Sequence, residues 1–384
     1  MTSLLRLPPL SLYIHIPWCI KKCPYCDFNS HEHAHIPEAE YVQRLRQDIE
    51  QELPGVANRK LSSIFFGGGT PSLFSANAID DILSFCEKTI GFAQRIEITL
   101  EANPGSFEQQ KFKDYHRAGV NRLSVGVQSF QPQFLQTLGR IHNTREAINA
   151  IASAQKAGFD NINIDLMHGL PDQTPELACK DLQTAIELGP QHISWYQLTI
   201  EPNTVFYRQA PSLPADDTLA DIQTAGQSLL AQQGFTQYEV SAYASSQQGS
   251  KHNINYWEFA DYIGIGAGAH GKITDITSQT IIRRQKTRLP KDYLSSTSEL
   301  IPNYKQWIID QDQLALEFMM NALRLMDGVP AEYFQQRTGL SLRSIDQTLQ
   351  QLVDRQLIIE YQQQLKTTEL GQRFLNDVIT AFSV

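Results

Sequence analysis

The stretch YIHIPWCIKKCPYCDF, residues 13–28, decides the fold. It begins as a β-branched run and passes into a loop that holds Cys19, Cys23 and Cys26 in the spacing C-x3-C-x2-C. The chain has five cysteines, an odd and low number for a disulfide scaffold, and three of them fall within eight residues. A strand that leads into three clustered thiols predicts a metal site at the end of a first β-strand.

Outward from this stretch, β-branched runs alternate with amphipathic segments, a pattern typical of βα units around a parallel sheet. Six such βα units, each a predicted strand followed by a helical pattern, predict an α/β fold, a partial (β/α)6 barrel. The loops that leave the C-terminal ends of barrel strands carry the reactive groups. The predicted strands cover residues 11–16, 62–66, 95–100, 122–127, 161–166 and 192–200.

The rest of the chain predicts a second, smaller domain. We place residues 1–300 in the barrel domain with a closing segment and linker, and residues 301–384 in a C-terminal α-rich domain. From residue 312 onward, helical patterns followed by a short hairpin resemble a winged helix. Residues 311–384 carry nine acids and six bases, which disfavours a nucleic-acid reader because such modules present basic surface.

Composition bounds the function. The 384 residues are 41% hydrophobic and 19% charged with a net charge of -9, a balance that argues against a phosphate backbone as the main partner. No stretch approaches the roughly 18 apolar residues that would cross a bilayer, and no N-terminal run is long enough for a signal peptide. We expect a soluble, cytoplasmic protein without an integral membrane segment.

The three thiols leave two kinds of metal site open. A structural zinc site needs four closed ligands, and His15 is the candidate that would complete one. Iron–sulfur clusters are held by cysteine thiolates, normally four. Three thiolates would therefore hold a [4Fe-4S] cluster with one iron open to an outside ligand. The two remaining cysteines, Cys86 and Cys179, share helical faces with apolar residues and are expected in the core.

The cysteine spacing resembles that of the radical S-adenosylmethionine (SAM) superfamily. The resemblance implies that the open iron binds the amino and carboxylate groups of SAM inside a partial barrel. The second predicted strand ends in FFGGGTPS, residues 65–72, which is similar to the turn that holds the SAM amino group in this superfamily. Three glycines also allow close approach of a ligand, although a tight turn without a ligand remains the alternative.

Further motifs resemble one branch of the superfamily, the coproporphyrinogen III oxidase-like proteins, and within it the heme chaperones. The motifs are TLEANPG, SVGVQSF, LGRIH and NIDLMHGLP, which follow the third, fourth and fifth predicted strands. We assign no catalytic residue. The resemblance implies that SAM is contacted by Tyr13, Tyr25, Gly68, Gly69, Thr70, Glu101, Gln128, Arg140 and Asp165.

Two features bear on which member of this branch the chain resembles. The oxidase has a fourth cysteine two positions after the third, where this chain has Phe28. HNINYW, residues 252–257, matches a pattern of the heme chaperones and implies that His252 is a heme ligand, although a packed histidine is the alternative. The basic run at residues 283–291 could pair with heme propionates, but a solvated loop is the favoured interpretation.

We therefore carry three hypotheses. The first is a heme chaperone with a [4Fe-4S] cluster and SAM that delivers heme to an acceptor protein such as a membrane respiratory enzyme; homodimer formation stays open. The second is an oxygen-independent coproporphyrinogen III oxidase, which would carry out radical oxidative decarboxylation. The third, a nucleic-acid reader built on the C-terminal module, is disfavoured by the acidity of that module.

Overall fold

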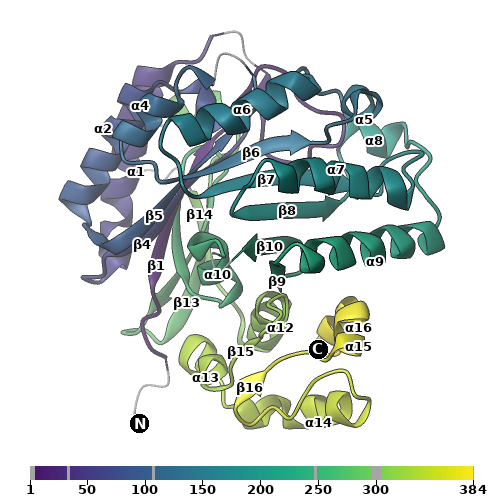
Figure 1. The fold of residues 1–384 in the computed structure, drawn as a ribbon. Coiled ribbons are helices and arrows are strands. Elements are labelled where there is room, and N and C mark those ends of the chain that lie inside the picture. Colours follow the sequence, from purple (N-terminus) through teal and green to yellow (C-terminus); the bar gives the residue numbers. More distant parts are fainter. Residues whose placement is uncertain (1–4, 33–34, 106–108, 246–248, 296–303, 384) are drawn as a thin grey trace.

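The computed structural model describes residues 5–32, 35–105, 109–245, 249–295 and 304–383. Figure 1 shows a curved sheet with helices on its outer face and a smaller group of helices at one end. The predicted partial α/β barrel is confirmed. Its six predicted strands form and run parallel to one another as β1 (Leu10–Ile16), β4 (Leu61–Gly68), β5 (Phe92–Ala102), β6 (Arg122–Gln128), β7 (Ile162–His168) and β8 (His192–Gln197).

Helices between the strands cover the outer face of the sheet (Figure 1). Some of them begin at a side-chain cap; the Ser75 side chain, for example, accepts the Ala78 N–H at the start of α2. They are α1 (Glu38–Val56), α2 (Ala76–Thr89), α4 (Phe112–Arg117), α5 (Pro132–Thr137), α6 (Thr144–Lys156), α7 (Pro175–Glu187), α8 (Val205–Arg208) and α9 (Asp216–Gln232).

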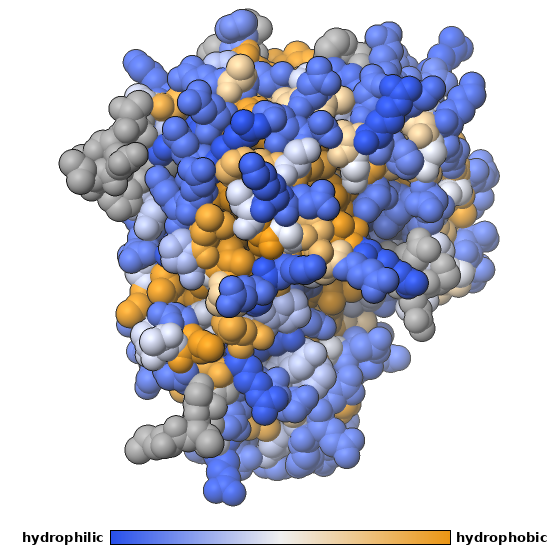
Figure 2. Space-filling view, turned by 90° about the vertical axis from the view of Figure 1, so that its left-hand side faces the viewer, coloured by the Kyte–Doolittle hydropathy of each residue, from blue (hydrophilic) through white to orange (hydrophobic). Residues whose placement is uncertain are grey.

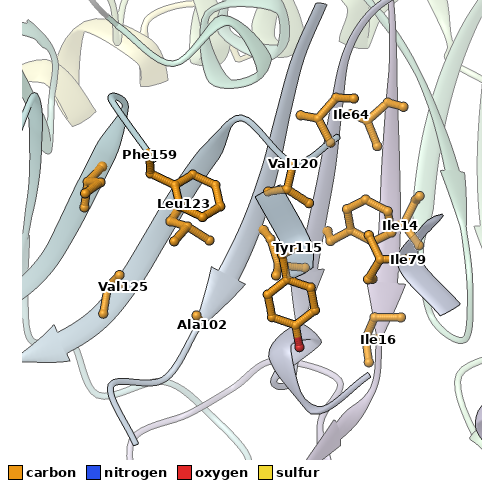
Figure 3. Close-up of a cluster of buried hydrophobic side chains, with 14 of the residues drawn as sticks. Ile14, Ile16, Ile64, Ile79, Ala102, Tyr115, Val120, Leu123, Val125 and Phe159 are labelled. Atoms are coloured by element: carbon orange, nitrogen blue, oxygen red, sulfur yellow. The ribbon is translucent and has the colours of Figure 1, made fainter. Parts of the chain in front are cut away.

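The main core lies between the sheet and these helices. Figure 3 shows Ile14 and Ile16 of β1 near Ile79 of α2, with Tyr115 of α4 beside them. Of the two cysteines expected in this core, Cys86 of α2 is fully buried. The prediction for Cys179 is wrong, because α7 turns that residue partly to solvent and leaves it half-buried.

The inner face of the strands is polar. Side chains alternate along a strand, so the residues between the apolar core positions point into the barrel. In β1, Leu12 and Ile14 belong to the core, while Ser11 lies on the other face with its hydroxyl 2.7 Å from that of Ser63 in β4. The barrel interior therefore carries polar groups along its length, beneath the loops at the C-terminal ends of the strands.

Over the residues that the structure describes, the sheet continues beyond the predicted barrel to twelve strands. β11 (Asp261–Ile265) pairs parallel to β1, and β12 (His270–Asp275), β13 (Thr280–Lys286) and β14 (Tyr304–Ile308) follow in antiparallel order. At the other edge, β10 (Ala242–Ser245) and β9 (Phe235–Glu239) extend β8. Two short helices, α10 (Lys251–Trp257) and α11 (Pro290–Ser295), complete this region. The segment that was expected to be a linker is thus part of the main sheet.

The basic run at residues 283–291 is a solvated loop only in part, around the exposed Arg288. Its first part is strand β13, and the charges of Arg283, Arg284 and Lys286 are paired. Lys286 is buried against Asp48 and lies 2.7 Å from a carboxylate oxygen of Glu52, both on α1. The partners of Arg284 and Lys286 lie more than two hundred residues upstream, and Arg283 pairs with Glu317 further along the chain. These distant partners make the cations internal counter-charges, which local composition cannot show.

The C-terminal residues form the predicted winged-helix-like, α-rich unit. Its apolar cluster also takes in Leu5, Phe259 and Ile281 from the first part of the chain, so the boundary at residue 300 stays a prediction. Its elements are α12 (Gln311–Ala322), β15 (Val329–Pro330), α13 (Glu332–Thr338), α14 (Asp346–Asp354), β16 (Gln364–Leu365), α15 (Glu369–Arg373) and α16 (Leu375–Thr380).

The surface is mostly polar. Figure 2 shows hydrophilic side chains over most of one face and an apolar patch near its middle. Among the helices that the structure describes, none combines the length and the apolar character that crossing a membrane requires.

Candidate functional site

A cavity of about 430 Å³ lies at the C-terminal ends of the parallel strands, where a barrel carries its reactive groups. It is formed by the cysteine loop after β1, the glycine turn after β4 and the ends of the next strands. The cavity brings together most of the site residues predicted from the sequence. Those in its lining are Cys19, Cys23, Tyr25, Cys26, Gly68, Gly69, Thr70, Glu101, Gln128, Arg140 and Asp165.

Two predicted site residues, Tyr13 and His252, lie in the barrel interior rather than in this lining. The Tyr13 hydroxyl is 3.0 Å from Nδ1 of His15, and its ring centre is 6.4 Å from that of His252. His252 is only 8% exposed, and its Nδ1 lies 3.1 Å from the Ser63 hydroxyl. Burial lowers the pKa of His252 to about 3, so the ring is neutral. Its role as a heme ligand stays a prediction.

The cysteine loop is fixed to the barrel at both ends. Its first residues form strand β2 (Trp18–Cys19), which pairs with β3 (His31–Glu32). The Thr70 N–H donates to the Trp18 carbonyl at 2.8 Å, and the Thr70 hydroxyl lies 3.6 Å from Sγ of Cys19. These contacts hold the start of the loop, with Cys19, at the cavity.

His15, the candidate for a fourth zinc ligand, is engaged elsewhere. Its Nε2 lies 2.9 Å from the Asn29 carbonyl, and its other ring nitrogen contacts Tyr13. Burial lowers the pKa of His15 to about 4. Within the described ranges of the chain, no three histidine, cysteine or acidic side chains are grouped as ligands of a single metal ion.

The glycine turn approaches the cysteine loop too closely for any other residue type. Gly68 has a φ of 113°, which glycine adopts readily, and a Cβ on Gly69 would lie 2.5 Å from the Trp18 carbonyl oxygen. The Gly68 N–H donates to a carboxylate oxygen of Glu101 at 3.2 Å. The turn therefore presents bare backbone to the cavity beside the thiols.

Two carboxyl groups, Glu101 and Asp165, belong to the same lining. Burial, reinforced by the negative charge of Asp165, raises the pKa of Glu101 to about 8. Burial also raises the pKa of Asp165, which accepts hydrogen bonds from Ser124 and Asn163 at 2.8 Å each. The pair offers hydrogen-bond acceptors for hydroxyl or ammonium groups of a ligand.

Arg140 crosses the cavity wall and reaches the cysteine loop. Its Nη2 donates to Oδ1 of Asn103 at 2.8 Å and to the Gly126 carbonyl, and its Nη1 lies 3.6 Å from Sγ of Cys23. Nearby, Gln128 has a positive φ of 68°, an uncommon conformation outside glycine that marks the end of β6. The guanidinium thus supplies positive charge between the thiols and the ends of β5 and β6.

Sequence reasoning missed several lining residues, among them Asn103, Ser124 and Tyr196. Ser124 and Tyr196 lie within strands and point inward, whereas attention to the loops after the strands favours residues further along. The signal that could have found them is the strict alternation in RLSVGV and HISWYQ, which places every second side chain inside the barrel.

The donor set fits an iron–sulfur cluster with a small polar ligand beside it. Three thiols line one side of the cavity, and a hydroxyl and a guanidinium lie within 3.6 Å of two of the sulfurs. Hydrogen bonds of this kind to cluster sulfurs tune the reduction potential. The glycine turn and the two carboxyl groups supply polar contacts for the ligand.

Comparisons with known proteins agree with this arrangement. The Radical SAM superfamily matches residues 13–182, and the HemN C-terminal domain matches residues 309–374. The chain is 50% identical over 382 residues to a Haemophilus influenzae protein named heme chaperone HemW, with 98% of each chain covered. It is 46% identical over 380 residues to the Escherichia coli protein of the same name, with 99% of each covered.

Among solved structures, coproporphyrinogen III oxidase (HemN) from Escherichia coli, described as a radical SAM enzyme, superimposes with a TM-score of 0.82 at 23% identity. The match covers 98% of this chain and 91% of that one. At this identity the likeness shows the shared fold, including the C-terminal unit.

Proposed function

The chain belongs to the HemW family within the radical SAM superfamily, and from that premise we propose that it is a heme chaperone carrying a [4Fe-4S] cluster and SAM. The observation that carries the cofactor part is the convergence of Cys19, Cys23 and Cys26 on one cavity with a glycine turn. The names of the full-length relatives support the heme part. The chain then passes heme to an acceptor protein, such as a membrane respiratory enzyme.

Cys19, Cys23 and Cys26 would hold the cluster, and one iron would remain open to SAM. Burial raises the pKa values of Cys19 and Cys26, so these thiols lose protons when metal binds. Thr70 and Arg140 then donate to the ligand sulfurs of Cys19 and Cys23. The chemistry that a cluster of this kind supplies is one-electron reduction of SAM.

The rest of the cavity binds and orients SAM. The Gly68–Gly69 backbone receives the amino end, while Glu101 and Asp165 accept from ammonium or hydroxyl groups. The Arg140 guanidinium can neutralise a carboxylate in a forked contact. Tyr25, Gln128 and Thr70 complete the lining, and Tyr13 supports it from below through His15.

Heme binds through His252, whose neutral ring is the form that ligates iron. The ring is packed 5.1 Å from that of Phe65, beneath the site. Heme reaches His252 only when α10 moves away from β4, so the packed arrangement is the closed state of the heme site. Movement of one short helix is a small change compared with unfolding of the barrel.

The experiment that distinguishes a heme chaperone from a coproporphyrinogen III oxidase tests the protein with coproporphyrinogen III and with heme. The cluster-loaded protein is incubated anaerobically with SAM, a reductant and coproporphyrinogen III, and a second sample is titrated with heme. We expect no protoporphyrinogen beyond the level of Cys23→Ser, and a heme Soret band that saturates at a fixed stoichiometry. Phe28, at the position of the oxidase's fourth cysteine, supports this expectation. Protoporphyrinogen formed at catalytic turnover contradicts the proposal.

A further inference from the structure

A chain of hydrogen bonds runs through the barrel interior from the first turn of α10 to the cavity. The Ser250 N–H donates to the Tyr238 hydroxyl at 3.2 Å, and that hydroxyl lies 2.7 Å from Nε2 of His192. Nδ1 of His192 contacts Oδ1 of Asn163, whose Nδ2 donates to a carboxylate oxygen of Asp165 at 2.8 Å. Asp165 lines the cavity. These hydrogen bonds thus connect the first turn of α10 with the cavity, although Ser250 and Asp165 are far apart in the sequence.

The donor and acceptor groups allow only one direction of donation along these hydrogen bonds. The Ser250 N–H can only donate, so the Tyr238 oxygen accepts from it and its own O–H points to His192. At the other end the Asn163 amide donates to the Asp165 carboxylate, which leaves the Asn163 oxygen as an acceptor. His192 must then accept at Nε2 and donate at Nδ1. Every donor points toward Asp165, and such aligned hydrogen bonds strengthen one another.

His192 can accept a hydrogen bond at Nε2 and donate one at Nδ1 because its ring is neutral. The side chain is fully buried in the barrel, and burial together with the charge of Arg122 lowers the pKa of His192 well below its ordinary value. Arg122 lies on β6 two residues before Ser124 and is 2% exposed. A neutral imidazole carries one N–H and one free lone pair, as the chain requires.

The hydrogen-bond series ends at the first turn of α10, which also carries His252. The Glu97 carboxylate of β5 accepts the N–H groups of Lys251 and His252 at 3.0 Å each and the Ser250 hydroxyl at 3.3 Å. The first turn of α10 therefore rests on two barrel residues, Glu97 and Tyr238. Of these two residues, Tyr238 is the one from which the described hydrogen bonds continue, through His192, to the cavity.

We propose that His192 is a positioning residue that ties the state of Asp165 in the cavity to the hold on α10 and its His252. The proposal rests on the proposed function, since SAM is the ligand that meets Asp165. A ligand that donates to Asp165 makes this carboxylate a poorer acceptor for Asn163, which weakens the aligned chain back to Ser250. Filling of the SAM site thereby loosens α10 and opens the way to His252.

Hydrogen exchange of α10 tests this coupling without measuring activity. The full-length, cluster-loaded protein is exchanged with and without SAM, and deuterium uptake is followed in the peptide that contains residues 250–257. We expect SAM to speed exchange there by about fivefold, an ordinary size for coupling between two sites. Tyr238→Phe removes one hydroxyl of the chain. In this variant SAM still binds, as measured by equilibrium dialysis, but no longer changes the exchange of α10.

Two further variants make the result specific. Tyr293→Phe is the matched control, because it also removes a buried hydroxyl. That hydroxyl donates to Asp48 at 2.7 Å and is not one of the hydrogen bonds between Ser250 and Asp165. This variant should keep the response of α10 to SAM. Asp165→Asn, exchanged without SAM, removes the anionic end of the chain and should speed exchange of α10 in the same direction. This last arm does not depend on SAM binding.

The outcomes are distinct. Unchanged α10 exchange with SAM bound overturns the inference, as does a Tyr238→Phe response equal to that of the wild type. If the wild type binds no SAM, the proposed function fails. The Asp165→Asn arm then decides the inference by itself, because unchanged exchange in that variant overturns it.

Discussion

Nη1 of Arg140 lies 3.6 Å from Sγ of Cys23, so a cation from the loop after α5 touches a thiol of the loop after β1. The same guanidinium bonds to Asn103 at 2.8 Å, at the end of β5. One side chain therefore joins three of the barrel's loops around the cavity. It also places positive charge where thiolates must form when metal binds.

Arg140→Met should weaken retention of the cluster. The substitution keeps most of the side-chain length but removes the charge at Cys23 and the contact with Asn103. Loss of a group that supports a metal ligand typically costs about 10- to 100-fold in metal affinity. We expect iron and sulfide per chain to fall faster in the variant during a chelator challenge. Arg117→Met, which removes an exposed cation, is the control, and equal retention in all three proteins would contradict the role of Arg140.

Glu101→Gln should stabilise the protein without cofactors at alkaline pH. The folded-state pKa of about 8 exceeds the ordinary value of 4.5, because burial and then Asp165 disfavour the charge. Between the ordinary pKa of 4.5 and the folded-state pKa of about 8, the folded protein keeps the Glu101 proton while the unfolded protein releases it. The free energy of unfolding of the wild type therefore falls as the pH rises toward 8. The glutamine variant escapes this loss, and we expect a gain of about 1 kcal/mol or more above pH 8.

The measurement is thermal unfolding of both proteins across this pH range. The difference in Tm should grow from pH 5 to pH 8.5 and nearly vanish at the acidic end. A difference that stays constant with pH would show that Glu101 is already ionised in the folded protein at neutral pH.

Gly266→Ala should destabilise the fold where the β11–β12 turn meets β1. Gly266 has a φ of 97°, and a Cβ there would lie 2.4 Å from the His15 carbonyl oxygen. Backbone strain and overpacking together cost about 3 kcal/mol. Gly189→Ala is the matched control, because Gly189 also has a positive φ but nothing lies within 4 Å of its Cβ position. Chemical denaturation should show about 1 kcal/mol for the control, and equal losses would refute the steric argument.

Lys286→Met should cost about 3–5 kcal/mol, because it leaves Asp48 and Glu52 buried without their shared cation. Lys366→Met, which removes a cation paired with the exposed carboxylate of Asp327, should change the free energy of unfolding by less than about 1 kcal/mol. Urea titration of both variants checks the contrast. Near-wild-type stability of Lys286→Met would contradict the role of Lys286 as their internal counter-charge.

The sequence predicted the parts of the fold that depend on local pattern. β1 and the cysteine loop could be placed because a β-branched run leads directly into the three thiols, and parallel strands bring their C-terminal ends together. Lys286 was misjudged because its charge is internal only when α1 packs behind β13. Such partners are distant in sequence, and composition treats a basic run as solvated.

The site was predicted in the same uneven way. The family resemblance singled out Glu101 and Gln128, which lie at the C-terminal ends of β5 and β6, and both line the cavity. His192 was not singled out, because it lies within a predicted strand and the prediction looked for site residues in the loops that follow the strands. His252 is packed as the alternative for this residue held, because α10 lies against β4, but the pattern HNINYW by itself does not specify that packing.

Heme transfer tests the central claim most directly. The cluster-loaded protein with SAM and one equivalent of heme is mixed anaerobically with increasing amounts of a heme-free b-type acceptor, and the Soret bands are followed in time. Direct delivery predicts a transfer rate that rises with acceptor concentration above the rate of heme loss to buffer. A rate that equals simple dissociation at every acceptor concentration would contradict the account of this chain as a heme chaperone.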